Sequence, residues 1–133
     1  MRGYCDNIER RTVENEDFRR VLYTGHNLQL VLMTLPPGCD IGDEVHEDRD
    51  QFFRIEDGSG IVRIDGADNR VEDDFAVIVP AGARHNVIND SDAPLRLYTI
   101  YGPPEHKDGI VHRTKEEAEE RHHAEGWDGK TTE

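Results

Sequence analysis

Two histidines, a glutamate and a glutamine have the residue types and the spacing of a metal site. Glu44 and His46 are two positions apart, so their side chains point to the same face of an extended chain. Gln51 opens the next predicted strand, and His85 begins another strand after Pro80-Ala81-Gly82. Divalent transition metals prefer imidazole nitrogens and hard oxygen atoms that converge from several directions. The four side chains would supply both kinds of ligand from three strands.

Each of these residues also has a plain structural interpretation. A single histidine is commonly a surface or core side chain. Gln51 alternates with Phe53 and Ile55, so it also fits the inner face of an ordinary strand. Asp50 could offer a carboxylate in place of Gln51, but alternation points it to the opposite face. The residue types alone therefore leave a metal site and an unrelated set of polar side chains open.

The elements that would position these side chains are short strands. Runs of β-branched and aromatic residues alternate with turns rich in Gly, Pro and Asp, which is typical of a β-sandwich or a barrel. Asp65-Gly66 is a strong signal for a hairpin turn. Residues 75–79 are predicted to form a buried strand. The predicted strands cover residues 21–23, 28–35, 51–55, 61–64, 75–79, 85–88 and 95–101.

The two ends of the chain differ from this pattern. The first 20 residues are polar and have few periodic apolar positions, so they are predicted to form an arm. At the other end, a capping box that begins at Thr114 and ends at Glu117 predicts a short helix over 115–125. The adjacent His122 and His123 fall in this helix and are interpreted as solvent-facing. The predicted organisation is an arm at 1–20, a barrel at 21–104, and a loop with a short helix at 105–133.

The spacing around the candidate ligands resembles the two sequence motifs of the cupin superfamily. In the first motif, two glycines enclose ligand positions that hold His, His and Glu. Gly38 and Gly58 enclose Glu44, His46 and Gln51 in the same register here. Two of the three ligand types therefore differ, because Glu replaces the first His and Gln replaces the Glu.

The second cupin motif is matched more fully. Pro80, Gly82, His85 and Asn89 keep its register, and Asp74 takes the place of its opening Gly. The motifs together span residues 38–89, and the strand pattern extends the resemblance over about 21–101. By these residues the chain is identified as a member of the cupin superfamily.

This resemblance implies an all-β fold, a double-stranded β-helix or jelly-roll barrel, with a short C-terminal helix and the site inside the barrel mouth. It implies that Gly82 makes the turn that aims His85 and that Asn89 is structural. Two imidazoles, a carboxylate and an amide oxygen suit Mn, Fe, Ni or Zn. Loss of the metal, so that the site binds a small molecule or nothing, is the alternative. The implied metal ligands are Glu44, His46, Gln51 and His85.

The resemblance also carries an expected activity. Small stand-alone cupins labelled mannose-6-phosphate-isomerase-like share Asp-Gln-Phe-Phe and Pro-Ala-Gly-x-x-His-Asn with this chain. That label rests on the barrel and does not establish an activity. A metal, a nearby proton acceptor and a small pocket favour a metal-dependent enzyme that isomerises or tautomerises a small polar carbonyl or sugar-like metabolite. Glu44 is then a candidate catalytic base as well as a ligand. The alternatives are a non-catalytic cupin that senses or stores a small ligand or metal, an Fe-dependent dioxygenase, and a structural cupin with a vestigial site.

Length and charge exclude other classes of protein. The 133 residues fit one domain, and 29 acidic against 16 basic side chains give a net charge of -13. Such a surface would repel nucleic acid and anionic membranes, so neither is expected as a partner. The acidic residues between positions 40 and 50 would attract cations and disfavour polyanions such as phosphorylated sugars.

Location and assembly follow from what the sequence lacks. It has no apolar leader and no stretch long enough to span a membrane, which predicts a cytoplasmic protein. Cys5 and Cys39 are predicted to be free thiols. The open sheet edges of a small barrel predict a homodimer, with residues 1–20 lying across the partner subunit.

Overall fold

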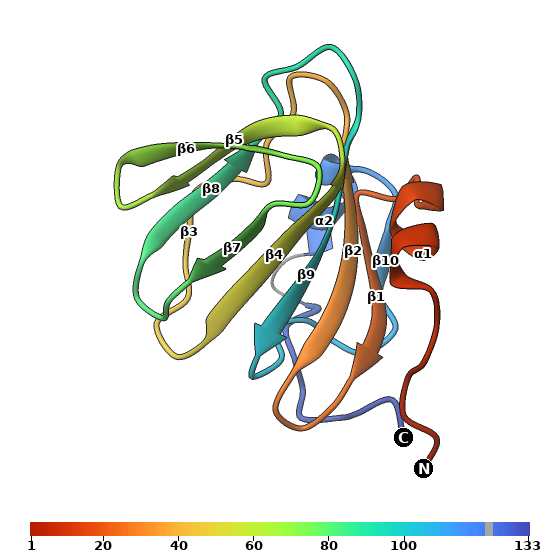
Figure 1. Cartoon of the computed structure of the whole chain (residues 1–133). Helices are drawn as coiled ribbons and strands as arrows, with labels where there is room; N and C mark the ends of the chain where they lie inside the picture. The colour runs from red at the N-terminus through yellow and green to blue at the C-terminus, as the bar shows by residue number, and fades with distance from the viewer. Residues whose placement is uncertain (122–123) are drawn as a thin grey trace.

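Alternation of apolar and polar residues folds the chain into two antiparallel sheets that face each other as a jelly-roll barrel (Figure 1). The structure is a computed structural model that describes residues 1–121 and 124–133. It confirms the expected all-β double-stranded β-helix with a short C-terminal helix. The larger, six-stranded sheet has the order β10-β1-β2-β9-β4-β7, formed by Val111–His112, Arg19–Thr24, Gln29–Leu35, Leu95–Gly102, Asp50–Asp57 and Ala76–Val79.

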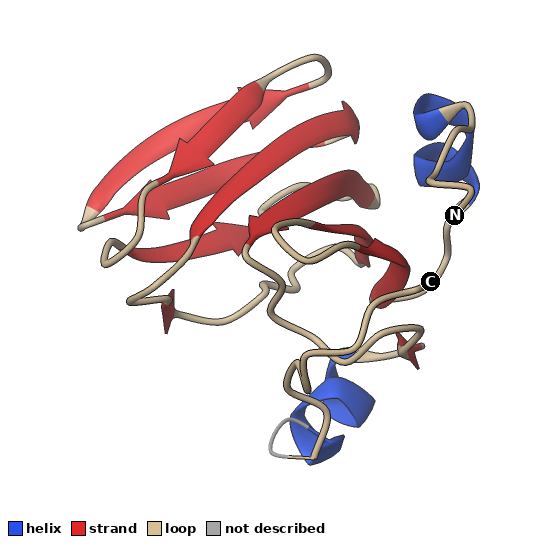
Figure 2. Cartoon of the chain, turned by 90° about the horizontal axis from the view of Figure 1, so that it is seen from below, coloured by secondary structure: helices blue, strands red, loops and turns tan. Residues whose placement is uncertain are grey.

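The smaller, four-stranded sheet has the order β3-β8-β5-β6. Its strands are Glu44–Val45, Arg84–Ile88, Ser59–Ile64 and Ala67–Glu72. The two helices are α1, Ile8–Glu14, and α2, Lys115–Arg121. They lie on different sides of the barrel (Figure 2). The larger sheet takes in Arg19 and His112, so it reaches beyond the expected barrel limits of 21–104 at both ends.

The apolar core and the polar site lie at opposite ends of the same strands. In β4 and β9 the residues Ile55 and Leu97 are fully buried and are cross-strand partners. Four positions along β4, the partners are the polar pair Gln51 and Tyr101, which are also buried. Burial of each large apolar side chain contributes about 1.5–3 kcal/mol, so the apolar end stabilises the barrel that holds the polar end in place.

Two turns have the backbone that the sequence pattern required. Asp65 and Gly66 join β5 to β6 with φ of 47° and 83°, as a hairpin turn with two left-handed residues demands. Asp74, which replaces the opening Gly of the second motif, also has a left-handed φ of 72°. Asp is among the few residue types other than Gly that adopt this conformation readily, so the substitution preserves the turn.

Residues 75–79 were predicted to form a buried strand, and the prediction that this strand is buried was wrong. The segment does form β7, but β7 is the last strand of the larger sheet and, among the described residues, pairs only with β4. Ile78 is 68% exposed and Phe75 is 44% exposed. A run of apolar residues reports strand propensity, whereas burial depends on which elements lie against the strand.

The N-terminal segment contains a helix that the sequence did not suggest. The side chain of Asn7 caps α1 by accepting a hydrogen bond from the Arg10 N–H. Thr12 is the buried residue of this helix, and Phe18, which follows it in the chain, belongs to the core. The helix packs against β2, β4 and β9 of its own chain. In this structure the segment packs on its own sheet, and its expected position across a partner subunit stays a prediction.

The C-terminal helix α2 begins as expected. The Thr114 hydroxyl accepts the N–H of Glu117, and the Glu117 carboxylate accepts the N–H of Arg113, one residue earlier than in a standard capping box. Lys115 forms an ion pair with Asp40, which ties the helix to the barrel. His122 and His123, at the end of the predicted helix, lie outside the described residues.

The thiols agree with the sequence-based expectation: Cys5 and Cys39 are both free, one exposed and one half-buried. Among the described residues, the helices are too short or too polar for any of them to traverse a lipid bilayer.

Gly60 occupies a position where a side chain would strike the neighbouring strand. A Cβ there would lie 2.5 Å from the Ile88 carbonyl oxygen. We expect Gly60→Ala to lower the free energy of unfolding by about 1–3 kcal/mol, because β5 would have to shift away from β8. Urea denaturation measures this loss. Gly126→Ala is the control, because its Cβ would meet nothing within 4 Å. Equal denaturation midpoints for the two variants would contradict the prediction.

Candidate metal centre

The four predicted site residues meet between the two sheets at the mouth of the barrel. Glu44 in β3 and His85 in β8 are direct cross-strand partners, so their side chains share a face. His46 follows β3, and ligand atoms of these three residues lie within 4.8 Å of one another. Gln51 reaches the cluster from β4, with its Oε1 3.1 Å from His85 Nε2. Small side-chain movements would bring all four atoms to the bond lengths of about 2.0–2.3 Å that transition metals require.

The orientation of the Gln51 amide is fixed by Thr99. The Thr99 hydroxyl donates to the carbonyl oxygen of Phe52 at 2.9 Å, so its lone pairs are free to accept. Gln51 Nε2 donates to this hydroxyl at 3.0 Å. The amide oxygen must therefore face the cluster. Because Gln51 is only 2% exposed, water does not compete for this oxygen.

His85 is oriented in a similar way from behind. Its Nδ1 lies 3.1 Å from the carbonyl oxygen of Ala83 and its Nε2 lies 3.1 Å from Gln51 Oε1, and both oxygens can only accept. A neutral ring has one N–H, so it can donate to only one of them. With the proton on Nδ1, as ligation through Nε2 requires, Nε2 presents a lone pair to Gln51 Oε1, and a cation bound by both atoms satisfies this contact. A proton on Nε2 would also satisfy it, but it would leave Nδ1 facing the Ala83 oxygen without a proton or make the buried ring an imidazolium.

Glu44 and His46 form the more open half of the cluster. His46 Nε2 lies 3.1 Å from Glu44 Oε2. Burial would raise the pKa of the Glu44 carboxyl, but the hydrogen bond from His46 and nearby positive charges outweigh it and lower that pKa. Burial would also lower the pKa of His46, but the bond to Glu44 and the charge of Glu105 raise it. Glu44 is therefore held as a carboxylate, the form that binds metal.

Glu105 is a site residue that the sequence did not reveal. It lies in the loop after β9, with its Oε2 3.5 Å from His46 Nδ1. Arg49 holds the same oxygen at 2.5 Å, although the two residues are 56 positions apart in the chain. A carboxylate behind a ligating histidine fixes the ring and its tautomer. No local motif could have identified Glu105, because only the folded loop brings it to His46.

The backbone around the ligands explains why the second motif has its spacing. Gly82 has a left-handed φ of 89°, and its N–H donates to the carbonyl oxygen of His46 at 2.9 Å. The turn that leads to His85 is thereby joined to the segment that carries His46. Asp50 faces away from the cluster, as alternation predicted, and accepts the N–H of Ala81 in the same turn. Asn89 donates to the Leu35 and Ala93 carbonyl oxygens, so its side chain braces the loops.

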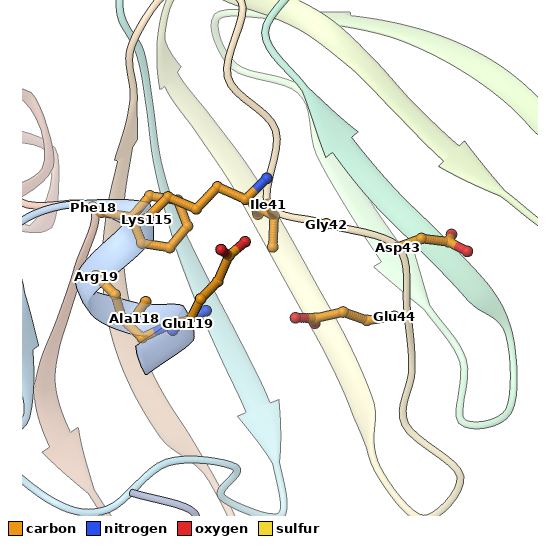
Figure 3. Close-up of a pocket in the computed structure, with 9 residues that line it drawn as sticks. All are labelled: Phe18, Arg19, Ile41, Gly42, Asp43, Glu44, Lys115, Ala118 and Glu119. Atoms are coloured by element: carbon orange, nitrogen blue, oxygen red, sulfur yellow. The ribbon is translucent and has the colours of Figure 1, made fainter. Parts of the chain in front are cut away.

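A pocket of about 330 Å³ opens beside the cluster, between α2 and residues 41–44. Glu44 reaches into it from one side (Figure 3). Arg19, Lys115 and Glu119 line the other side. The cluster therefore has a route to a small molecule through Glu44, and the walls of that route are charged.

Comparison with known proteins places these features in a family. Residues 31–101 match the cupin domain family. The chain is 49% identical over 118 residues to the uncharacterized protein YrkC of Bacillus subtilis, covering 84% of this chain and 63% of YrkC. It is 38% identical over 112 residues to the uncharacterized protein L612 of Acanthamoeba polyphaga mimivirus, covering 81% of this chain and 70% of L612. The crystal structure of BH2720 from Bacillus halodurans superposes with a TM-score of 0.88 at 45% identity, covering 90% of this chain and 95% of that one.

The role of Glu105 as a positioning residue can be measured as metal affinity. We expect Glu105→Gln to weaken Zn²⁺ binding by about 10–100-fold, because the His46 ring loses the carboxylate that orients it. Competition with a chromophoric chelator gives the dissociation constant. Asp48→Asn is the matched control, since it removes the exposed partner of the same Arg49 and should leave the affinity unchanged. Wild-type affinity in Glu105→Gln would show that this contact does not support the site.

Proposed function

The chain belongs to the cupin family, and from this premise we propose that it is a metal-dependent enzyme that isomerises or tautomerises a small polar carbonyl or sugar-like metabolite. The observation that supports this most is the convergence of lone pairs at the barrel mouth. Gln51 and His85 are each turned toward the same point by a hydrogen bond from behind. In this proposal the metal ligands are Glu44, His46, Gln51 and His85.

The donor set fits a divalent transition metal. Two imidazoles, one amide oxygen and one carboxylate carry a single negative charge, so a bound Mn, Fe, Ni or Zn ion would keep a net positive charge. Such an ion, when bound, supplies a Lewis acid that polarises a carbonyl oxygen. Glu44 and His46 are half-buried, whereas Gln51 and His85 are buried, so the cluster is more accessible on the side of Glu44 and His46.

Glu44 is the ligand placed to meet a substrate. It contributes both to the cluster and to the lining of the adjacent pocket. Its lowered pKa suits a ligand better than a base, so ligation is its main role in this proposal. A proton next to the substrate carbonyl could be taken by the Glu44 carboxylate only if Glu44 leaves the ion. His46 would then remain within hydrogen-bonding distance of the carboxylate.

Metal content tests the ligand set. We expect wild-type protein to hold about one equivalent of a divalent transition metal, and His46→Ala and His85→Ala to lose it. His26→Ala is the control, since His26 is exposed in the turn between β1 and β2. Plasma mass spectrometry measures the metal. Less than about 0.2 equivalents in the wild type, without recovery on adding Mn, Fe, Ni or Zn, would contradict a metal-dependent function.

Turnover separates an enzyme from a sensor that uses the same ligands. Metal-loaded protein is expected to convert at least one member of a panel of keto sugars and diketones, with the His85→Ala variant inactive. A silent panel together with ligand-induced shifts in melting temperature would favour the non-catalytic alternative. Consumption of O₂ by the Fe-loaded protein would favour the dioxygenase.

We further propose that the chain forms a homodimer through the free edge of β7. Ile78 lies outward on this strand and is in register with Phe52, Ile100 and Leu30, so an apolar row crosses four strands of the larger sheet. The strand carries no charged residue that would protect its edge. The same edge of a second copy could pair with it antiparallel about a two-fold axis, which would cover both edges at once.

The dimer proposal predicts that a charge on β7 separates the subunits. We expect wild-type protein to scatter light as a dimer and Ile78→Lys as a monomer, because an edge lysine opposes strand pairing. Ala67→Lys places the same side chain at an exposed site on β6 of the other sheet and should remain dimeric. A monomeric mass for the wild type, or a dimeric mass for Ile78→Lys, would contradict the proposal.

A further inference from the structure

Arg19 is a buried charge without a salt bridge in the part of the chain that the structure describes. The residue is only 7% exposed, and its Nε is buried without a hydrogen-bond partner among the described residues. The next residue, Arg20, faces outward on the same strand and pairs with Asp17. A buried guanidinium that lacks a partner destabilises a fold. Its position at the mouth of the barrel points to a partner that comes from outside the chain.

The surroundings of Arg19 hold it in place without an ion pair among the described residues. Its guanidinium carbon lies 5.3 Å from the centre of the Phe18 ring, a cation–π contact that fixes the side chain and leaves its N–H groups available. Arg19 lines the pocket of about 330 Å³ that also contains Glu44. In Figure 3, Glu44 reaches into this pocket from the strand side and Arg19 from beneath α2.

The remaining charges around the pocket are largely paired. Lys115 pairs with Asp40. Asp43 pairs with Arg84 at 2.9 Å. Arg19 shares this pocket with Glu119 and Glu44, and the latter is one of the proposed metal ligands. Arg19 also lines a smaller pocket with Glu105 and Glu125, neither of which forms an ion pair with it among the described residues. A divalent ion more than neutralises the Glu44 carboxylate, so the metal-loaded pocket would present two positive centres, the ion and the guanidinium, to an incoming molecule.

We propose that this pocket binds a small organic acid with an oxygen atom next to its carboxylate, as in 2-oxo and 2-hydroxy acids, and that Arg19 pairs with the carboxylate. A planar guanidinium matches a carboxylate better than it matches a neutral hydroxyl group. The adjacent oxygen would face the metal side of the pocket, where Glu44 lies. This inference rests on the proposed function and names the substrate class of the same site. The pocket volume lies at the small end of the range for ligand sites.

The test compares gluconate with sorbitol, which differ by a carboxylate in place of a hydroxymethyl group. Calorimetric titration of Zn²⁺-loaded protein is expected to show that gluconate binds at least about ten-fold more tightly. Arg19→Met should abolish this preference, because the variant keeps an unbranched apolar stem and loses the guanidinium. Arg20→Met, next to it on the outward face, should keep the preference.

Two further readouts make each outcome decisive. Metal content is measured in every sample, so absence of metal overturns the proposed function. If the ratio of the dissociation constants for gluconate and sorbitol is the same in the wild type and in Arg19→Met, at any metal content, the role of Arg19 is overturned. We also expect Arg19→Met to melt at a higher temperature than the wild type, because it removes a buried charge without a partner. A lower melting temperature than that of Arg20→Met would make Arg19 a structural residue and contradict the inference.

Discussion

Two hydrogen bonds behind the barrel mouth decide what the site can hold. Thr99 accepts from the Gln51 amide nitrogen, and the Ala83 carbonyl oxygen lies 3.1 Å from His85 Nδ1, where it accepts the proton of the Nδ1–H tautomer. As a result, the lone pairs of Gln51 Oε1 and His85 Nε2 point toward the same place. Glu44 and His46 direct their own ligand atoms to that point from β3 and the residue after it. Acceptors that face one another in a buried place need a cation or a proton between them, so this arrangement favours a metal ion.

The pairing of strands in the barrel positions the residues that form these hydrogen bonds. Thr99 belongs to β9 and bonds the Phe52 carbonyl oxygen, so the pairing of β9 with β4 orients Gln51. On the smaller sheet, the Gly82 N–H joins the turn before His85 to the segment that carries His46. The mouth is bounded by α2, which Lys115 ties to Asp40. A metal ion bound by the cluster would also make the adjacent pocket more positive, because Glu44 belongs to both. The ion and the buried Arg19 would then act on the same ligand.

The sequence predicted those parts of the fold and the site that depend on local spacing. Strand alternation and turn residues indicate the barrel, and the motif register identifies Glu44, His46, Gln51 and His85. Glu105 and Arg19 could not be found in this way, because their importance comes from what the folded chain places beside them. The exposure of Ile78 was missed for a related reason. A run of apolar residues does not say whether its strand lies in the middle of a sheet or at its edge.

Binding of one metal ion by the four converging side chains can be observed by anomalous diffraction from crystals of the metal-loaded protein, recorded at the absorption edge of the ion. We expect one peak at about 2.0–2.3 Å from Glu44, His46, Gln51 and His85, with the Gln51 amide still bonded to Thr99. A peak at any other place, or a saturated crystal in which Gln51 and a protonated His85 remain bonded to each other with no ion between them, would contradict it.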